Sequence, residues 1–101
     1  SLLHLETILR SKPAAFIYEP LVQGAAGMRM YSPTFIEKAL QLCAEAGVLT
    51  IADEVMTGFG RTGPLFASSI PAVSPDIICL SKGITGGLIP LGVTTCRQSI
   101  Y

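Results

Sequence analysis

A short apolar run at residues 48–52, V-L-T-I-A, ends abruptly in two acids, Asp53 and Glu54. A continuous run of this kind is typical of a strand that is covered on both faces in a parallel sheet. A second apolar run, at residues 77–80, ends in a similar way, shortly before Lys82. We therefore expect an α/β fold in which both strands end at one edge of the sheet.

The rest of the chain alternates strands with helices, as a parallel sheet requires. Helical spacing of apolar residues predicts helices at residues 2–10 and 33–46. We expect strands at residues 14–18, 48–52, 76–80 and 91–95. Residues 21–30 contain two glycines, show no clear period and are predicted to form a loop. Two helices leave at least one face of four strands thinly covered, so we also expect companion segments beyond these residues.

The second predicted helix has two possible starting points. Ser32 suits the N-cap, because Pro33 would then occupy the first helical position. Thr34 with Glu37 instead fits a capping box in a competing register. At the other end, Gly47 is expected to stop the helix.

Composition argues against several classes of partner. Half of the 101 residues are hydrophobic, the formal net charge is zero and the seven basic residues are scattered, so we expect no nucleic-acid or anionic-membrane interface. No apolar run reaches the roughly 18 residues of a membrane span, and no signal peptide is recognisable. A cytoplasmic or mitochondrial-matrix location is expected. Because the chain begins at Ser1 and not at Met, we expect it to be a piece of a longer protein.

Three cysteines, Cys43, Cys79 and Cys96, lie in apolar runs and form no C-x-x-C spacing. We expect reduced, buried thiols in place of disulfides or a zinc site. The single histidine, His4, has no metal-ligating residues at a suitable spacing. No metal site is therefore predicted.

Polar residues follow each of the predicted parallel strands, namely Glu19, then Asp53 and Glu54, then Lys82. Ligands of open α/β sheets collect beyond the carboxyl ends of the strands. Taken singly, Asp53 could be a turn or capping residue and Lys82 a solvated loop lysine. Together they predict a site, because a lysine in surroundings that disfavour its charge becomes a nucleophile. Arg61, in F-G-R-T-G, is expected either to bind a carboxylate or to pair with Glu54 or Glu19.

A rival interpretation comes from another class of protein. The segment V-L-T-I-A-D-E resembles the Walker B strand of nucleotide-hydrolysing proteins, whose acids hold magnesium and position water. The partner motif of that class, G-x-x-x-x-G-K-[ST], does not occur in this sequence. We keep this as a remote alternative.

Three segments in combination resemble the class III aminotransferases, pyridoxal-phosphate enzymes of fold type I. They are E-P-L-V-Q-G-A-A-G-M, I-A-D-E-V-M-T-G-F-G-R-T-G and P-D-I-I-C-L-S-K-G-I-T-G-G. The resemblance covers essentially the whole chain, although family members are several times longer. It implies that residues 1–101 are the central part of the large, cofactor-binding domain, an α/β fold with a mostly parallel sheet and an antiparallel last strand. It also implies a homodimer, with active sites completed at the subunit interface.

The resemblance carries roles over to individual residues. Lys82 matches the lysine that forms a Schiff base with the cofactor and then moves the proton between substrate and cofactor. Asp53 matches the aspartate that pairs with the pyridine nitrogen, and Val55 matches the apolar residue on one face of the ring. The other matched positions surround the cofactor and substrate: Glu19, Gln23, Glu54 and Arg61.

Met56 separates subgroups of the family. Ornithine- and aminobutyrate-type relatives have a glutamine at this position that donates a hydrogen bond to the cofactor, which methionine cannot do. With an apolar residue at this position, the chain resembles the biotin-pathway group and the broad omega-amino-acid group. The former implies an amino-oxo acid as acceptor and S-adenosylmethionine as donor. We expect the 101 residues alone to be inactive, because the phosphate-binding loop and other family site residues lie outside them.

Overall fold

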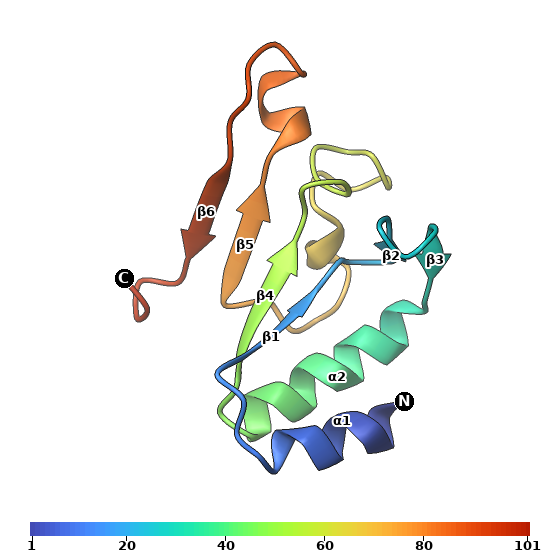
Figure 1. The fold of residues 1–101 in the computed structure, drawn as a ribbon, viewed down its shortest axis with the longest axis vertical. Helices are drawn as coiled ribbons and strands as arrows, with labels where there is room; N and C mark the ends of the chain where they lie inside the picture. Colours follow the sequence, from blue (N-terminus) through green and yellow to red (C-terminus); the bar gives the residue numbers. More distant parts are fainter.

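A computed structural model describes residues 1–101 as a four-stranded sheet, two helices and a small separate hairpin (Figure 1). The helices are α1 (Leu2–Leu9) and α2 (Pro33–Glu45). The sheet contains β1 (Ala15–Tyr18), β4 (Leu49–Asp53), β5 (Ile77–Leu80) and β6 (Val93–Cys96). The hairpin consists of β2 (Val22–Gln23) and β3 (Arg29–Met30), and two short 3-10 helices are η1 (Ala67–Ser69) and η2 (Lys82–Thr85).

Strand pairing confirms the predicted fold class. The strand order is β1-β4-β5-β6, in which β1, β4 and β5 run parallel and β6 runs antiparallel to β5. The carboxyl ends of β1, β4 and β5 therefore reach the same edge of the sheet (Figure 1). Asp53 pairs with Cys79, so the last residue of β4 lies beside the end of β5, shortly before Lys82.

The limits of α2 follow from its end residues. The Phe35 N–H donates a hydrogen bond to the Ser32 Oγ at 3.2 Å, and Pro33 is the first helical residue. Ser32 is thus the N-cap, and the alternative start at Thr34 is wrong. At the other end Gly47 has a φ of +68°, a left-handed conformation that glycine adopts without a steric penalty.

The core lies between α2 and one face of the sheet. Its central cluster consists of Tyr18, Ile36, Ala39, Leu40 and Ala52. A second cluster joins α1 to α2: Leu9, Cys43 and Val48. Every buried residue of α2 belongs to one of these clusters, which confirms the helical spacing predicted for α2, whereas in α1 only Leu9 is buried.

The opposite face of the sheet has no helix over it (Figure 1). Ile17, which alternates with the buried Tyr18, is 63% exposed, and Leu49 is 39% exposed. Although half of the residues are hydrophobic, only 19 of 101 are buried. The expectation of an uncovered sheet face is therefore confirmed.

The structure corrects several details. Residues 21–30 are not only a loop, because β2 and β3 pair there, Val22 with Met30 and Gln23 with Arg29. Two-residue strands are too short to show an alternating pattern, which is why the sequence does not reveal them. Cys96 is exposed, contrary to the expectation of three buried thiols, because it lies on the edge strand β6; all three cysteines are free. No helix has the combination of length and apolar character that spanning a membrane requires.

Candidate active site

A cavity of about 450 Å³ opens at the carboxyl edge of the sheet. Its wall consists of Glu19, Gly24, Ala25, Met28, Asp53, Val55, Met56 and Lys82. Three stretches that are far apart in the sequence contribute to this wall: the end of β1 with the hairpin, the end of β4, and the start of η2. The volume falls in the range of about 300–1,000 Å³ that is typical of small-molecule sites.

Asp53 ends β4 on the uncovered side of the sheet. Its Oδ1 accepts a hydrogen bond from the Val55 N–H at 3.0 Å, so Asp53 does serve as a turn residue. Its Oδ2 receives no hydrogen bond from the chain, and the carboxylate is half-buried in the cavity wall. One oxygen of Asp53 is therefore available to a ligand in the cavity.

Lys82 is the first residue of η2 and has a φ of +44°. This left-handed conformation is uncommon for a residue with a Cβ. The backbone before Lys82 is anchored, because the Ser81 hydroxyl donates to the Leu91 carbonyl oxygen at 2.7 Å. The exposed ammonium group forms no ion pair within the chain. Lys82 thus contributes an unpaired amine to the same cavity as Asp53.

Glu19 joins the hairpin to the end of β1. Its Oε2 accepts a hydrogen bond from the Gly24 N–H at 2.8 Å, and its carbonyl oxygen accepts one from the Tyr31 hydroxyl. The Tyr31 hydroxyl is the donor of this second bond, and burial raises its pKa to about 12. Sequence reasoning missed Tyr31, because no local motif links it to Glu19.

Gly24 and Met56 form a close contact in the cavity wall. A Cβ added at Gly24 would lie 2.6 Å from the Met56 Sδ, well inside van der Waals contact. The absence of a side chain at Gly24 therefore lets Met56 fill this part of the wall. Ala25 and Met28 extend the apolar surface, and neither was singled out as a site residue from the sequence.

The remaining predicted site residues lie outside this cavity. Glu54 is completely buried on the helix side of β4. Arg61 is exposed and forms no ion pair, so of its two expected roles the binding of a carboxylate stays a prediction, and the pairing with Glu54 or Glu19 is wrong. The reason is that Glu54 is occupied by the Thr57 hydroxyl and two backbone N–H groups. Gln23 lines an adjoining hollow of about 240 Å³ together with Asp53. The roles of these residues toward a substrate stay predictions.

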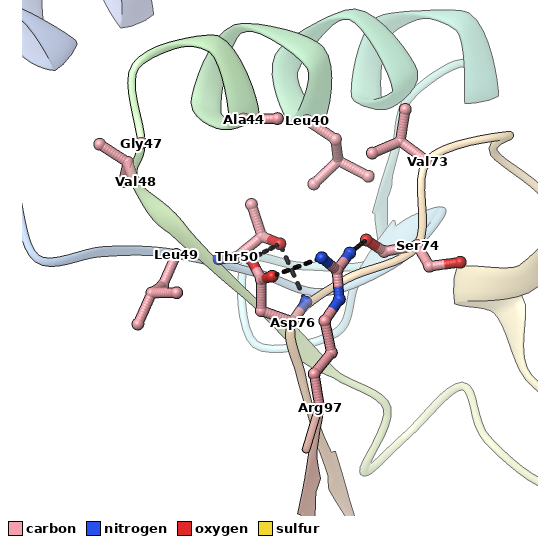
Figure 2. A pocket seen from close by; sticks show the side chains of 10 residues that line it. All are labelled: Leu40, Ala44, Gly47, Val48, Leu49, Thr50, Val73, Ser74, Asp76 and Arg97. Atoms are coloured by element: carbon pink, nitrogen blue, oxygen red, sulfur yellow. Dashed lines mark hydrogen bonds and ion pairs between the residues drawn. The ribbon is translucent and has the colours of Figure 1, made fainter. Parts of the chain in front are cut away.

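The amino edge of the sheet has a second cavity, of about 240 Å³ (Figure 2). There the Asp76 Oδ2 accepts hydrogen bonds from the N–H and the hydroxyl of Thr50, each at 2.8 Å. The Asp76 Oδ1 lies 3.2 Å from the Arg97 Nη1, and the Arg97 Nη2 donates to the Ser74 carbonyl oxygen at 2.9 Å. Sequence reasoning missed this network, although the S-P-D segment before β5 marks its position.

Comparison with known protein families assigns the chain to a class of enzyme. An aspartate and a lysine at neighbouring strand ends of a mostly parallel sheet are what the resemblance to class III aminotransferases implied. The family model described as Aminotransferase class-III matches residues 2–101. The chain therefore belongs to this family, and the nucleotide-hydrolase alternative is wrong.

The proteins that this chain resembles include two named kinds of aminotransferase. The adenosylmethionine-8-amino-7-oxononanoate aminotransferase of Synechococcus elongatus is 57% identical over 88 residues, which cover 87% of this chain and 21% of that protein. The same-named protein of Geobacter sulfurreducens is 46% identical over 103 residues, covering 99% of this chain and 23% of that protein. The solved structure of Plasmodium falciparum ornithine delta-aminotransferase has a TM-score of 0.93 and 39% identity, covering 99% of this chain and 26% of that one. The chain thus spans about a fifth of the length of the curated relatives, 21% and 23% in these two cases.

Proposed function

We propose that these residues are the central part of the large domain of a pyridoxal-phosphate-dependent aminotransferase of biotin synthesis. The observation that carries the proposal is the shared cavity, in which Asp53, Val55 and Lys82 form parts of one wall. The class-III family match supports the type of reaction. Because the chain spans only a fifth of its curated relatives, at 21% for the first of them, activity is proposed for the complete protein.

The residues of the cavity fit pyridoxal phosphate. Lys82 offers an amine without an ion pair, and Asp53 offers a carboxylate oxygen without a hydrogen bond from the chain. Val55 adds an apolar side chain to the same wall. Its N–H donates a hydrogen bond to the Asp53 Oδ1, and this bond orients the carboxylate. The wall contains no arginine, serine or threonine, so we propose that the phosphate is held by residues beyond these 101.

When bound, pyridoxal phosphate supplies an aldehyde and a protonated ring that withdraws electrons from the substrate carbon. The Lys82 amine would hold the cofactor through its aldehyde, and as a free amine it would act as the base that moves a proton. The Asp53 carboxylate would hold the ring end of the cofactor and, through its negative charge, would favour the protonated ring. Val55 would provide an apolar surface for the ring, and Glu19 supports the hairpin side of the wall through Gly24.

Met56 favours the biotin-pathway group over ornithine-type enzymes. Its side chain is part of an apolar surface with Ala25 and Met28, which suits the alkyl chain of an amino-oxo fatty acid. The curated relatives named for that reaction have up to 57% identity, against 39% for the ornithine enzyme compared above. We propose S-adenosylmethionine as amino donor and an amino-oxo acid as acceptor. A broad omega-amino-acid transaminase is the alternative, favoured by the same apolar wall.

A homodimer is part of the proposal, because the resemblance to class III aminotransferases implies active sites that are completed at a subunit interface. The isolated 101 residues would then be a non-catalytic piece. The expected cytoplasmic or mitochondrial-matrix location stays a prediction.

Borohydride reduction of the cofactor-loaded complete enzyme, followed by peptide mapping, tests the proposal. We expect the cofactor to be fixed on Lys82, with no label on the exposed Lys38. Lys82→Ala should abolish labelling and lower kcat by a factor of about 10²–10⁴, whereas Lys38→Ala should leave both unchanged. A label on another lysine would contradict the assignment. Faster turnover with simple omega-amino acids than with S-adenosylmethionine would support the alternative substrate group.

A further inference from the structure

Glu54 directly follows Asp53, yet the two carboxylates lie on opposite sides of the sheet at the end of β4. The Glu54 side chain is 0% exposed, whereas Asp53 lines the cavity. The Glu54 Oε1 accepts a hydrogen bond from the Ser68 N–H at 2.6 Å. Its Oε2 accepts hydrogen bonds from the Ala67 N–H at 3.2 Å and from the Thr57 hydroxyl at 2.6 Å. A carboxylate enclosed in this way cannot touch a substrate, so its influence on the site passes through the segments that it holds.

Glu54 holds the loop at residues 55–66. Thr57 lies near the start of this loop, and Ala67 and Ser68 follow its end, so one carboxylate fixes both ends. The Gly58 N–H also donates to the Glu54 carbonyl oxygen at 2.8 Å. A Cβ at Gly58 would lie 2.8 Å from that oxygen, so the loop leaves β4 along a path that only glycine permits.

The loop places Phe59 against the start of η2. A Cβ at Gly83 would lie 2.8 Å from the Phe59 Cδ2, so the phenyl ring lies directly on the Gly83 backbone. Phe59 is itself constrained, with a φ of +62° and an edge-to-face contact with Phe66 at a centroid distance of 5.6 Å. In Figure 1 this loop follows the green strand β4 and reaches the orange η2.

Lys82 immediately precedes Gly83 and has a left-handed φ of +44°. Left-handed conformations of residues other than glycine persist only where the surrounding structure enforces them. On one side the Ser81 hydroxyl is fixed by the Leu91 carbonyl oxygen, at 2.7 Å. On the other side the enforcing contact is the Phe59 ring on Gly83.

We propose that Glu54 is a positioning residue for Lys82. Its buried carboxylate fixes residues 55–66, and the contact of Phe59 with Gly83 then holds the Lys82 backbone in the conformation that places Lys82 in the cavity wall. The inference rests on the proposed function in one respect, the naming of Lys82 as the reacting amine.

Glu54→Gln in the cofactor-free complete enzyme tests the inference, with Asp76→Asn as matched control. Both variants neutralise a carboxylate that accepts hydrogen bonds from backbone N–H and hydroxyl groups, but Asp76 lies at the opposite edge of the sheet. In Glu54→Gln one carboxylate oxygen is replaced by an NH₂ group, which cannot accept a hydrogen bond. At least one of the donors that Glu54 satisfied, the Thr57 hydroxyl and the Ala67 and Ser68 N–H groups, then loses its acceptor. We expect amide hydrogen exchange in η2, at Ile84 and Gly86, to become about tenfold faster, and to be unchanged in Asp76→Asn.

Cofactor capture provides a second readout, which loss of stability alone would not change. After mixing with pyridoxal phosphate, the visible absorbance of the lysine-bound cofactor should appear about tenfold more slowly in Glu54→Gln, per folded molecule, and at the normal rate in Asp76→Asn. Phe59→Ala should slow it similarly. Because Glu54 acts through Phe59, the double variant should be no slower than either single variant.

Equal η2 exchange in Glu54→Gln and Asp76→Asn would overturn the inference, as would effects of Glu54→Gln and Phe59→Ala that multiply. Should Glu54→Gln fail to fold, Phe59→Ala alone is decisive, since normal η2 exchange in that variant contradicts the proposed contact. A borohydride label away from Lys82 would overturn the proposed function, while the exchange measurement would still decide the role of Glu54.

Discussion

The two edges of the sheet carry similar polar residues and use them differently. At the amino edge, Asp76 binds Thr50 and Arg97, so its oxygens are all engaged (Figure 2). At the carboxyl edge, Asp53 keeps one oxygen without a partner and Lys82 forms no ion pair. Charges that satisfy one another stabilise the fold, whereas charges left unsatisfied at a cavity are available for chemistry.

Strand direction explains the difference. The antiparallel β6 brings Arg97 back to the amino edge, where its N–H donates to the Asp76 carbonyl oxygen at 3.1 Å and its guanidinium reaches the carboxylate. The carboxyl edge receives Lys82 from the end of β5. Lys82 lies there between Ser81, whose hydroxyl donates to the Leu91 carbonyl oxygen, and Gly83, which contacts Phe59. Three predictions test whether the two edges are functionally separate.

The largest effect is expected from Asp53→Asn in the complete enzyme. The asparagine oxygen can still accept the Val55 N–H, so the turn survives while the negative charge is lost. We expect kcat to fall by a factor of about 10²–10³, because a charge aimed at the reacting group is removed. Steady-state kinetics should show a change of less than about twofold for Asp76→Asn, because Asp76 lies at the amino edge and does not line the cavity that contains Lys82. Similar losses in both variants would erase the distinction between the edges.

Asp76→Ala should reduce stability without changing kcat. It leaves the part-buried N–H and hydroxyl of Thr50 without their acceptor. We expect the free energy of unfolding to fall by about 1–3 kcal/mol. Urea unfolding of the cofactor-free enzyme measures the loss, and Glu45→Ala, at an exposed acid without an ion pair, should stay within about 0.5 kcal/mol of the original. An unchanged urea midpoint would show that the Asp76 network does not stabilise the sheet.

The smallest effect is expected from Arg97→Ala. The Arg97 side chain is 53% exposed, so solvent screens its ion pair with Asp76. We expect a loss of at most about 1 kcal/mol, decreasing further at high salt. Arg10→Ala, at an exposed arginine without an ion pair, is the control and should show no salt-dependent loss. A loss larger than that of Asp76→Ala would mean that Arg97 contributes mainly through packing.

Local sequence patterns predicted much of the fold. The stripe of Ile36, Ala39, Leu40 and Cys43 gave α2 its buried face, and the apolar runs gave β4 and β5 to within one residue. These features depend on periodicity and on chain neighbours, which can be read along the sequence. Asp53 and Lys82 were predicted for the same reason, since each follows such a run.

Other site features could not be read in this way. The contact of Thr50 with Asp76 joins residues 26 apart in the sequence, and that of Glu54 with Ser68 joins residues 14 apart. No local sequence pattern predicts the contact between Gly24 and Met56. The ion pair considered for Arg61 does not form, because the Arg61 side chain is exposed. Such pairings arise from how the strands and loops are arranged in space.

By itself, then, the sequence determined the α/β class, the order of the main elements, the family, and the two strand ends at which Asp53 and Lys82 lie. Only the tertiary structure decided that Asp53 and Glu54, adjacent in the chain, have different surroundings. The physical reason is the alternation of side chains across a strand, combined with coverage of one face only. On the uncovered side Asp53 keeps a free oxygen at the cavity, whereas on the covered side Glu54 is enclosed by the loop that it holds.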